Sequence, residues 1–144
     1  MKHTLATMIL ALCLLPATTF ARDDIGNYTI ADAMNTDHAK NKLGDSVRFY
    51  FGDQTYGDPQ QTMGEFSTSK KTNAFNKTDL EACQWVFLSA MIALKDRAIK
   101  EGGNAVVEIK SNYKHNLTSS NDTFQCGAGA LMAGVALTGK VVKL

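Results

Sequence analysis

Apolar residues recur at steps of three and four over residues 80–101, and this pattern predicts a long amphipathic helix with one buried face. The buried face comprises Leu80, Cys83, Phe87, Ala90, Met91, Leu94 and Ala98. Thr78 and Glu81 have the spacing of a capping box, in which each side chain bonds a backbone N–H at the helix start. Gly102, followed by a second glycine, supplies the left-handed residue that often ends a helix. Trp85 lies off the main stripe, but we expect it to pack in the core.

Apolar runs on both sides of this helix predict strands. Residues 47–51 alternate between apolar and polar, and residues 105–113 are rich in Val and Ile. A weaker strand is expected over residues 62–68, followed by a solvated loop over residues 69–77. The glycine-rich run 124–142 is interpreted as one long strand, bent or bulged at glycine, because its glycines would weaken a helix. These elements predict an α+β fold, an antiparallel-rich sheet with one long helix packed on it.

The first residues of the chain have the pattern of a secretory leader. Lys2 precedes an apolar run over residues 8–16, and small residues, Thr19 and Ala21, stand at the −3 and −1 positions of a cleavage site. The run is about half the ~20 residues that span a bilayer, which disfavours a retained anchor. We therefore expect residues 1–21 to be a signal peptide and the mature protein to be periplasmic or secreted.

Removal of this leader leaves about 120 residues, enough for one domain. Residues 22–45 form a polar N-terminal segment, with a short helix expected over residues 37–43 and ended by Gly44, and residues 46–144 form a single α+β domain. Loss of Lys2 lowers the count of basic residues from 15 to 14, against 14 acidic residues. A neutral chain without a basic cluster has no electrostatic reason to bind nucleic acid or anionic lipid.

Two of the three cysteines remain after cleavage. Cys13 leaves with the leader, and Cys83 and Cys126 persist in an oxidising compartment, where paired cysteines commonly form a disulfide. The alternative is a reactive thiol at Cys83, because the early turns of a helix can lower the pKa of a thiol. The chain has no C-x-x-C motif, and Cys83 lies on the predicted buried face. The sequence therefore favours a structural Cys83–Cys126 disulfide.

The remaining chemical side chains do not assemble into a known catalytic motif. Residues 134–141, GVALTGKV, match the phosphate-binding loop of ATPases at every position but the last, where Val141 lacks the hydroxyl that holds magnesium. Only three residues follow, so no helix can begin there to face a phosphate. The sequence shows neither a nucleophile elbow nor a local carboxylate pair. We therefore expect no enzymatic activity and no cofactor.

Candidate metal ligands are few and dispersed. They are Asp37, His38, His115 and Asp122. A zinc site favours more ligands at short spacing, so we interpret these side chains as solvated and expect no metal site.

Several runs of the chain resemble known bacterial sequences. FYFGDQ, KKTNAFNK and CGAGALMAGVALTGKVVKL resemble a family of short secreted proteins that often carry the label "excinuclease ATPase subunit". RAIKEGGNAVVEIKSNY, a loop and GVALTGKVVKL resemble YbjQ-type domains and the periplasmic domain of the Rcs envelope-stress lipoprotein. The first resemblance covers nearly all of the mature chain and the second residues 81–144. They imply a β-α-β-β core of the dodecin-subunit-like kind and no established activity.

Together these features predict a non-catalytic binding or envelope-sensing module that acts through a protein partner or through self-association. Two alternatives remain open at this point. One is a small thiol-redox enzyme that uses Cys83. The other is a weak metal-binding protein, which the resemblance to YbjQ-type domains keeps under consideration.

Overall fold

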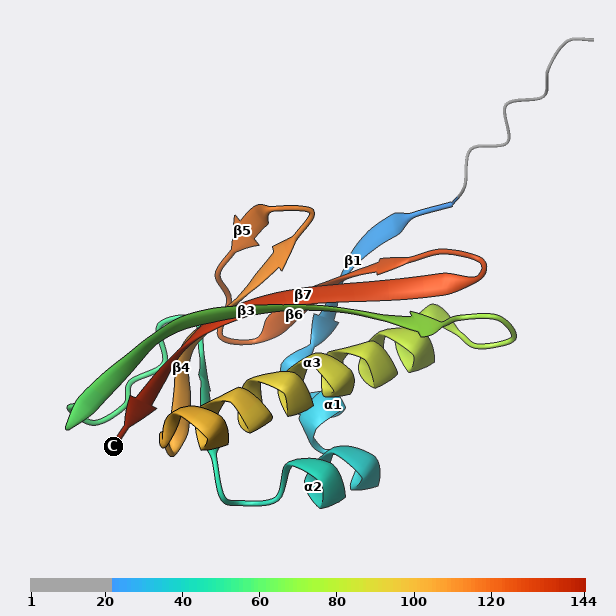
Figure 1. The fold of residues 1–144 in the computed structure, drawn as a ribbon. Helices are drawn as coiled ribbons and strands as arrows, with labels where there is room; N and C mark the ends of the chain where they lie inside the picture. The colour runs from blue at the N-terminus through green and yellow to red at the C-terminus, as the bar shows by residue number, and fades with distance from the viewer. Residues whose placement is uncertain (1–21) are drawn as a thin grey trace, which may run out of the picture.

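The computed structural model describes residues 22–144, so the expected leader and its cleavage site lie outside the described residues. Figure 1 shows how the elements are arranged. In chain order they are β1 (Asp24–Thr29), α1 (Ile30–Met34), α2 (Asp37–Leu43), β2 (Arg48–Phe51), β3 (Gln61–Asn73), α3 (Asp79–Glu101), β4 (Ala105–Tyr113), β5 (Asn116–Thr118), β6 (Thr123–Ala128) and β7 (Met132–Lys143).

Within residues 22–144, seven strands form one sheet, in which β7 and β4 each pair with three other strands. β7 pairs with β3, β4 and β6, while β1 pairs with β6 and β5 with β4. Every ladder is antiparallel except the one between β2 and β4, which is parallel. The expected α+β class, with one long helix on a sheet, is confirmed, and the sheet is mixed.

α3 runs beneath the sheet along β3 and β7, and α1 and α2 pack against α3 from its other side (Figure 1). Side chains of β7 alternate between the two faces of the sheet. Val135 and Leu137 are buried in the core together with Leu94 of α3, and the rings of Phe87 and Phe124 stack with centroids 4.1 Å apart. The main core therefore lies between α3 and one sheet face, and the other face is the more open one.

The predicted long helix is confirmed as α3. The Thr78 hydroxyl accepts the Glu81 N–H at 3.1 Å, and Gly102 ends the helix with a φ of 80°. Six of the seven expected core positions are buried, but Leu80 is wrong, because its side chain is 51% exposed. Leu80 lies in the first turn of α3, ahead of Ala82, the first buried residue of the helix.

The strands β2 and β4 lie where the sequence predicts them, but two expectations about strands are wrong. β3 continues to Asn73, so Lys70 and Lys71 belong to a strand and not to a loop. Pairing with β7 supplies the backbone partners, and an edge strand accepts polar side chains on both faces.

The expected long strand over residues 124–142 is a hairpin, in which the Gly129 N–H donates to the Met132 carbonyl at 2.8 Å. At Gly129 a Cβ would lie 2.7 Å from the Arg22 carbonyl, so the turn requires glycine.

Residues 22–45 pack against the sheet and α3, which are formed by the rest of the described chain. The expected short helix is confirmed as α2, which ends at Gly44 with a φ of 58°. β1 adds to the edge of the sheet beside β6, although its sequence, DIGNYT, has few apolar positions. These residues bring the start of the described chain to the end of the molecule where β6 and β7 join (Figure 1).

Candidate functional site

A hollow of about 580 Å³ lies at the end of the sheet formed by the β6–β7 hairpin. We call it the sheet hollow. It is lined by Arg22, Asp23, Lys71, Tyr113, Lys114, Gly127, Gly129, Ala130, Leu131, Met132, Ala133 and Gly134. Four of these residues are charged, and the hairpin contributes small or apolar side chains. The hollow is therefore apolar along the hairpin. Its charged side chains come from the start of the described chain, from β3 and from the β4–β5 turn.

Tyr113 forms the inner wall of the sheet hollow by lying on a pair of glycines. Gly127 of β6 and Gly134 of β7 are opposite each other in the ladder. A Cβ at Gly127 would lie 2.1 Å from the Tyr113 hydroxyl oxygen, and one at Gly134 would lie 3.2 Å from the ring. The tyrosine ring thus rests directly on backbone. Its hydroxyl donates to Asp23 Oδ1 at 3.1 Å, which connects β4 to the start of the described chain.

A tight turn carries Lys114 to the same carboxylate. Lys114 and His115 both have positive φ, at 51° and 63°, as in the two-residue turns that suit β-hairpins. The Lys114 ammonium donates to Asp23 Oδ2. This hydrogen bond is the main reason that the pKa of Asp23 is lowered, with burial opposing it, and it also raises the pKa of Lys114. Burial, followed by the hydrogen bond to Asp23, raises the pKa of Tyr113.

The other two cations of the sheet hollow have different environments. Arg22 pairs with Asp24 at 2.6 Å and with Asp79 at the start of α3. Lys71 forms no ion pair with any other residue that the structure describes. Arg22 and Lys114 are thus already paired with carboxylates, and Lys71 is the cation of the hollow that is left to attract an anionic group.

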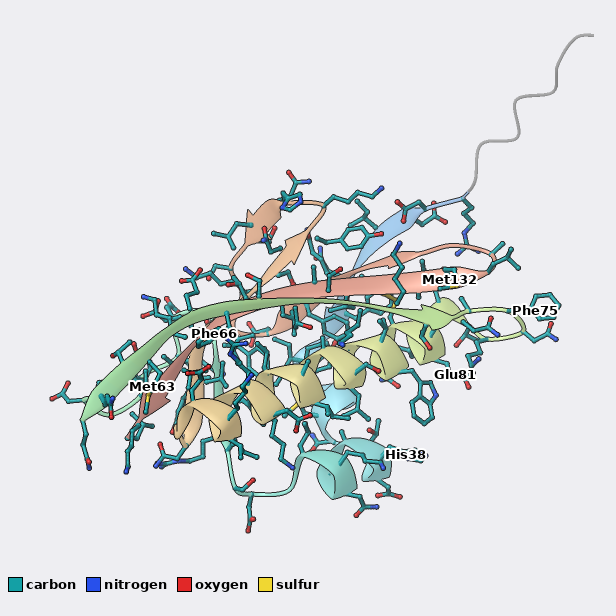
Figure 2. All side chains as sticks on the ribbon, viewed as in Figure 1. His38, Met63, Phe66, Phe75, Glu81 and Met132 are labelled. Carbon is teal, nitrogen blue, oxygen red and sulfur yellow. A yellow bond between two sulfur atoms is a disulfide. The ribbon has the colours of Figure 1, made fainter. Side chains whose placement is uncertain are left out.

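Exposed apolar side chains gather beside the sheet hollow. Leu131 and Met132 at the hairpin are 64% and 50% exposed, and Phe75 in the β3–α3 loop is 58% exposed. A backbone hydrogen bond from Ala74 to Leu131, at 2.8 Å, joins the two segments. Figure 2 shows Phe75 and Met132 at the same end of the molecule. We call Phe75, Leu131 and Met132 the apolar rim.

The cysteines expected to pair are brought together by the fold. The Sγ atoms of Cys83 and Cys126 lie 2.06 Å apart, at disulfide distance, and link α3 to β6. Both side chains are completely buried. A reagent in solution therefore has no direct path to either sulfur in the folded protein.

The candidate metal ligands are not brought together. Asp37 and His38 belong to α2, His115 to the β4–β5 turn, and Asp122 precedes β6. No group of three metal-ligating side chains forms in the part of the chain from residue 22 onward.

The expectation that Trp85 packs in the core is wrong, because its side chain is 40% exposed. It lies on the flank of α3 that faces α2, where its ring contacts His38 with centroids 4.7 Å apart.

The run that resembles a phosphate-binding loop is a strand. Residues 134–141 lie within β7 and pair with β3 along the whole run and with β4 over its second half. Their backbone groups are therefore engaged in the sheet and do not form a cradle of free N–H groups at a helix start. This geometry does not suit phosphate binding.

Sequence reasoning placed Tyr113 at the end of a predicted strand but did not connect it with Asp23, Lys71 or Lys114. Asp23 and Tyr113 are 90 positions apart, so no local motif connects them. The one local signal was Lys114–His115, a polar pair that immediately follows a predicted strand and begins a hairpin.

No family model, curated protein or solved structure matches this chain. The helices of residues 22–144 are all too short or too polar to cross a membrane.

Proposed function

We propose that the protein is an exported, non-catalytic binding module of the cell envelope, and that it binds a protein segment that presents a carboxylate beside apolar side chains. The observation that carries the proposal is the sheet hollow, in which Lys71 has no carboxylate partner among the described residues and lies near the exposed apolar rim. Protein interfaces commonly combine such an exposed apolar patch with polar groups around it.

Export is supported by the leader pattern of residues 1–21 and by the cysteine pair. A disulfide between Cys83 and Cys126 would form and persist in an oxidising compartment. The burial of both sulfurs argues against the thiol-redox alternative, since a redox cysteine needs access to its substrate. The relation to YbjQ-type and Rcs periplasmic domains, with a dodecin-subunit-like core, stays a prediction.

Site-specific photo-cross-linking in the exporting cell tests this proposal. A photoreactive residue replaces Ala130, which is exposed in the sheet hollow, and a control replaces Lys40, which is exposed on α2. We expect a discrete adduct with another envelope protein from position 130 and not from position 40. Lys114→Ala should weaken this adduct, because it removes a cation from the hollow, and Asp32→Ala on α1 should not.

Three results would contradict the proposal. Equal adducts from both positions would mean that the hollow is not selective. An adduct insensitive to Lys114→Ala would remove the role of charge. Alkylation of Cys83 in the native exported protein would favour the thiol enzyme instead.

A further inference from the structure

β3 is a long strand with one free edge. Twelve of its 13 residues pair with β7, Met63 lies at a shift of register, and no other strand of residues 22–144 adjoins its outer side (Figure 1). Most of its side chains are exposed. The unpaired N–H and C=O groups on such an edge form a template for pairing with another chain.

The register shows which backbone groups point outward. The Ala74 N–H donates to the Leu131 carbonyl, and the ladder continues without a shift from Asn73–Met132 to Gly64–Val141. Hydrogen-bonded pairs alternate along an antiparallel ladder. Even-numbered residues from 64 to 74 therefore bond to β7, and odd-numbered residues from 65 to 73 direct their N–H and C=O groups to the free edge.

The side chains of these odd-numbered residues lie on the sheet face away from α3. Ser67 Oγ hydrogen-bonds Thr138 Oγ1 at 3.3 Å, and the same Thr138 hydroxyl donates to Glu65 Oε1 at 3.2 Å. Lys71 lines the sheet hollow on this face. Glu65 and Lys71 are thus two exposed, opposite charges six residues apart on one side of the edge strand. Neither forms an ion pair with another described residue.

We propose that β3 pairs in antiparallel fashion with β3 of a second copy of this chain, about a two-fold axis at Thr68. This register places Glu65 of each copy opposite Lys71 of the other, so the dimer contains two cross-strand pairs of opposite charge. Odd-numbered residues face odd-numbered residues, and their free N–H and C=O groups bond across the interface. Because the axis is perpendicular to the sheet, both α3 helices lie on the same face.

The charges of Glu65 and Lys71 favour this register over the neighbouring ones, and they favour a second copy of the chain over a foreign strand. A shift of two residues in one direction places Glu65 opposite Ser69, and a shift in the other direction places it opposite Asn73. Lysine on an edge strand normally opposes pairing with a foreign strand. Here the second copy supplies the carboxylate that Lys71 lacks within its own chain, so the edge is complementary to itself.

The flank of α3 beside β3 carries small side chains that suit such a dimer. The Arg97 guanidinium lies 4.0 Å from the centre of the Phe66 ring, so this flank of α3 borders β3. Ser89 and Ala93 precede Arg97 at steps of four on the same flank, and their small side chains allow two α3 helices to lie side by side. Lys70 of one copy lies opposite Phe66 of the other, on whose ring Arg97 already stacks. The charge attraction is therefore concentrated on the face away from α3.

Sedimentation of the mature protein, residues 22–144 with both cysteines intact, tests the dimer. We expect the wild type to dimerise, and Glu65→Lys or Lys71→Glu alone to raise the dimer dissociation constant about tenfold or more, because each places like charges opposite each other twice. A 1:1 mixture of these two variants should dimerise like the wild type, since opposite charges then meet at both contacts. A monomeric wild type, or a mixture no tighter than the variants alone, would overturn the proposal. Thermal unfolding checks that both variants remain folded.

A cysteine scan tests the register. Thr68→Cys would meet itself across the axis at a non-hydrogen-bonded position, where Cα atoms lie about 4.5 Å apart and a disulfide fits. Thr72→Cys, on the same face of the same strand, would meet Gly64 and is the matched control. We expect an intermolecular disulfide from position 68 and not from position 72. Equal cross-linking of both, or cross-linking of position 72 alone, would refute the register.

Discussion

Removal of the cysteine pair should be among the most destabilising changes that this fold can undergo. Cys83 and Cys126 are separated by 43 residues. Opening a cross-linked loop of that size costs about 4 kcal/mol in the chain-entropy model. Cys83→Ala with Cys126→Ala also empties two completely buried positions, at a cost on the order of 1 kcal/mol each. The total, about 6 kcal/mol, is a large fraction of the roughly 5–15 kcal/mol that holds a domain folded.

Urea unfolding, followed by circular dichroism and by the fluorescence of Trp85, measures this loss. A domain of this size loses roughly 3–5 °C of melting temperature per kcal/mol, so the double variant should melt about 20 °C lower. Wild-type protein reduced in denaturant and refolded with reductant is the control. It keeps both side chains and should lose only the ~4 kcal/mol of the cross-link. The oxidised protein should also have the smaller urea dependence, because its unfolded chain is more compact.

The single variants separate the cross-link from the packing. Each one breaks the same bond, so each should lose nearly as much free energy of unfolding as the double variant. The sum of the two single-variant losses should exceed the loss of the double variant by about 4 kcal/mol. Oxidised and reduced wild type with equal free energies of unfolding would refute the reasoning. So would two freely alkylated thiols in the native exported protein.

Three further predictions concern the core, the sheet hollow and export. Leu94→Asp should unfold the domain because it buries an unpaired charge, whereas Ile99→Asp, on an exposed part of the same helix, should leave the melting temperature nearly unchanged. The pKa of Tyr113 should lie above the ordinary value for tyrosine, because burial and the hydrogen bond to Asp23 disfavour its phenolate. Gly127→Ala should lower that pKa by displacing the ring, and an unchanged absorbance titration would contradict this. Intact-mass analysis of the exported protein should find that it begins at Arg22, and a mass that includes residues 1–21 would be the opposite result.

The parts of the fold that the sequence predicts well are those in which burial dominates. α3 has a cap at each end and a continuous buried face, and β4 is rich in residues that prefer strands. Periodicity reports such elements because one side of each is shielded from water. The close approach of Cys83 and Cys126 is predictable for the same reason, because both residues are buried in one core.

The elements that the sequence misses are edges and turns. β1 and the second half of β3 have polar side chains on both faces, so their alternation is weak although their backbone pairing is complete. Hydrogen bonds to a neighbouring strand decide such segments, and a single sequence does not show that neighbour. The sheet hollow is hidden for a related reason. Asp23 reaches Tyr113 only because β1 brings the start of the described chain to the β6–β7 hairpin.

The glycines of residues 124–142 affect both the prediction of strands and the formation of the sheet hollow. A glycine in a strand can mark a bend, but it can also mark the close approach of another group. Gly139 lies where a Cβ would be 2.6 Å from Val106, in the middle of a strand that pairs without interruption with β3. Gly127 and Gly134 lie under the Tyr113 ring. Two of the glycines that made this run look like a bent or bulged strand thus let a side chain rest on the backbone, and that contact forms the wall of the sheet hollow.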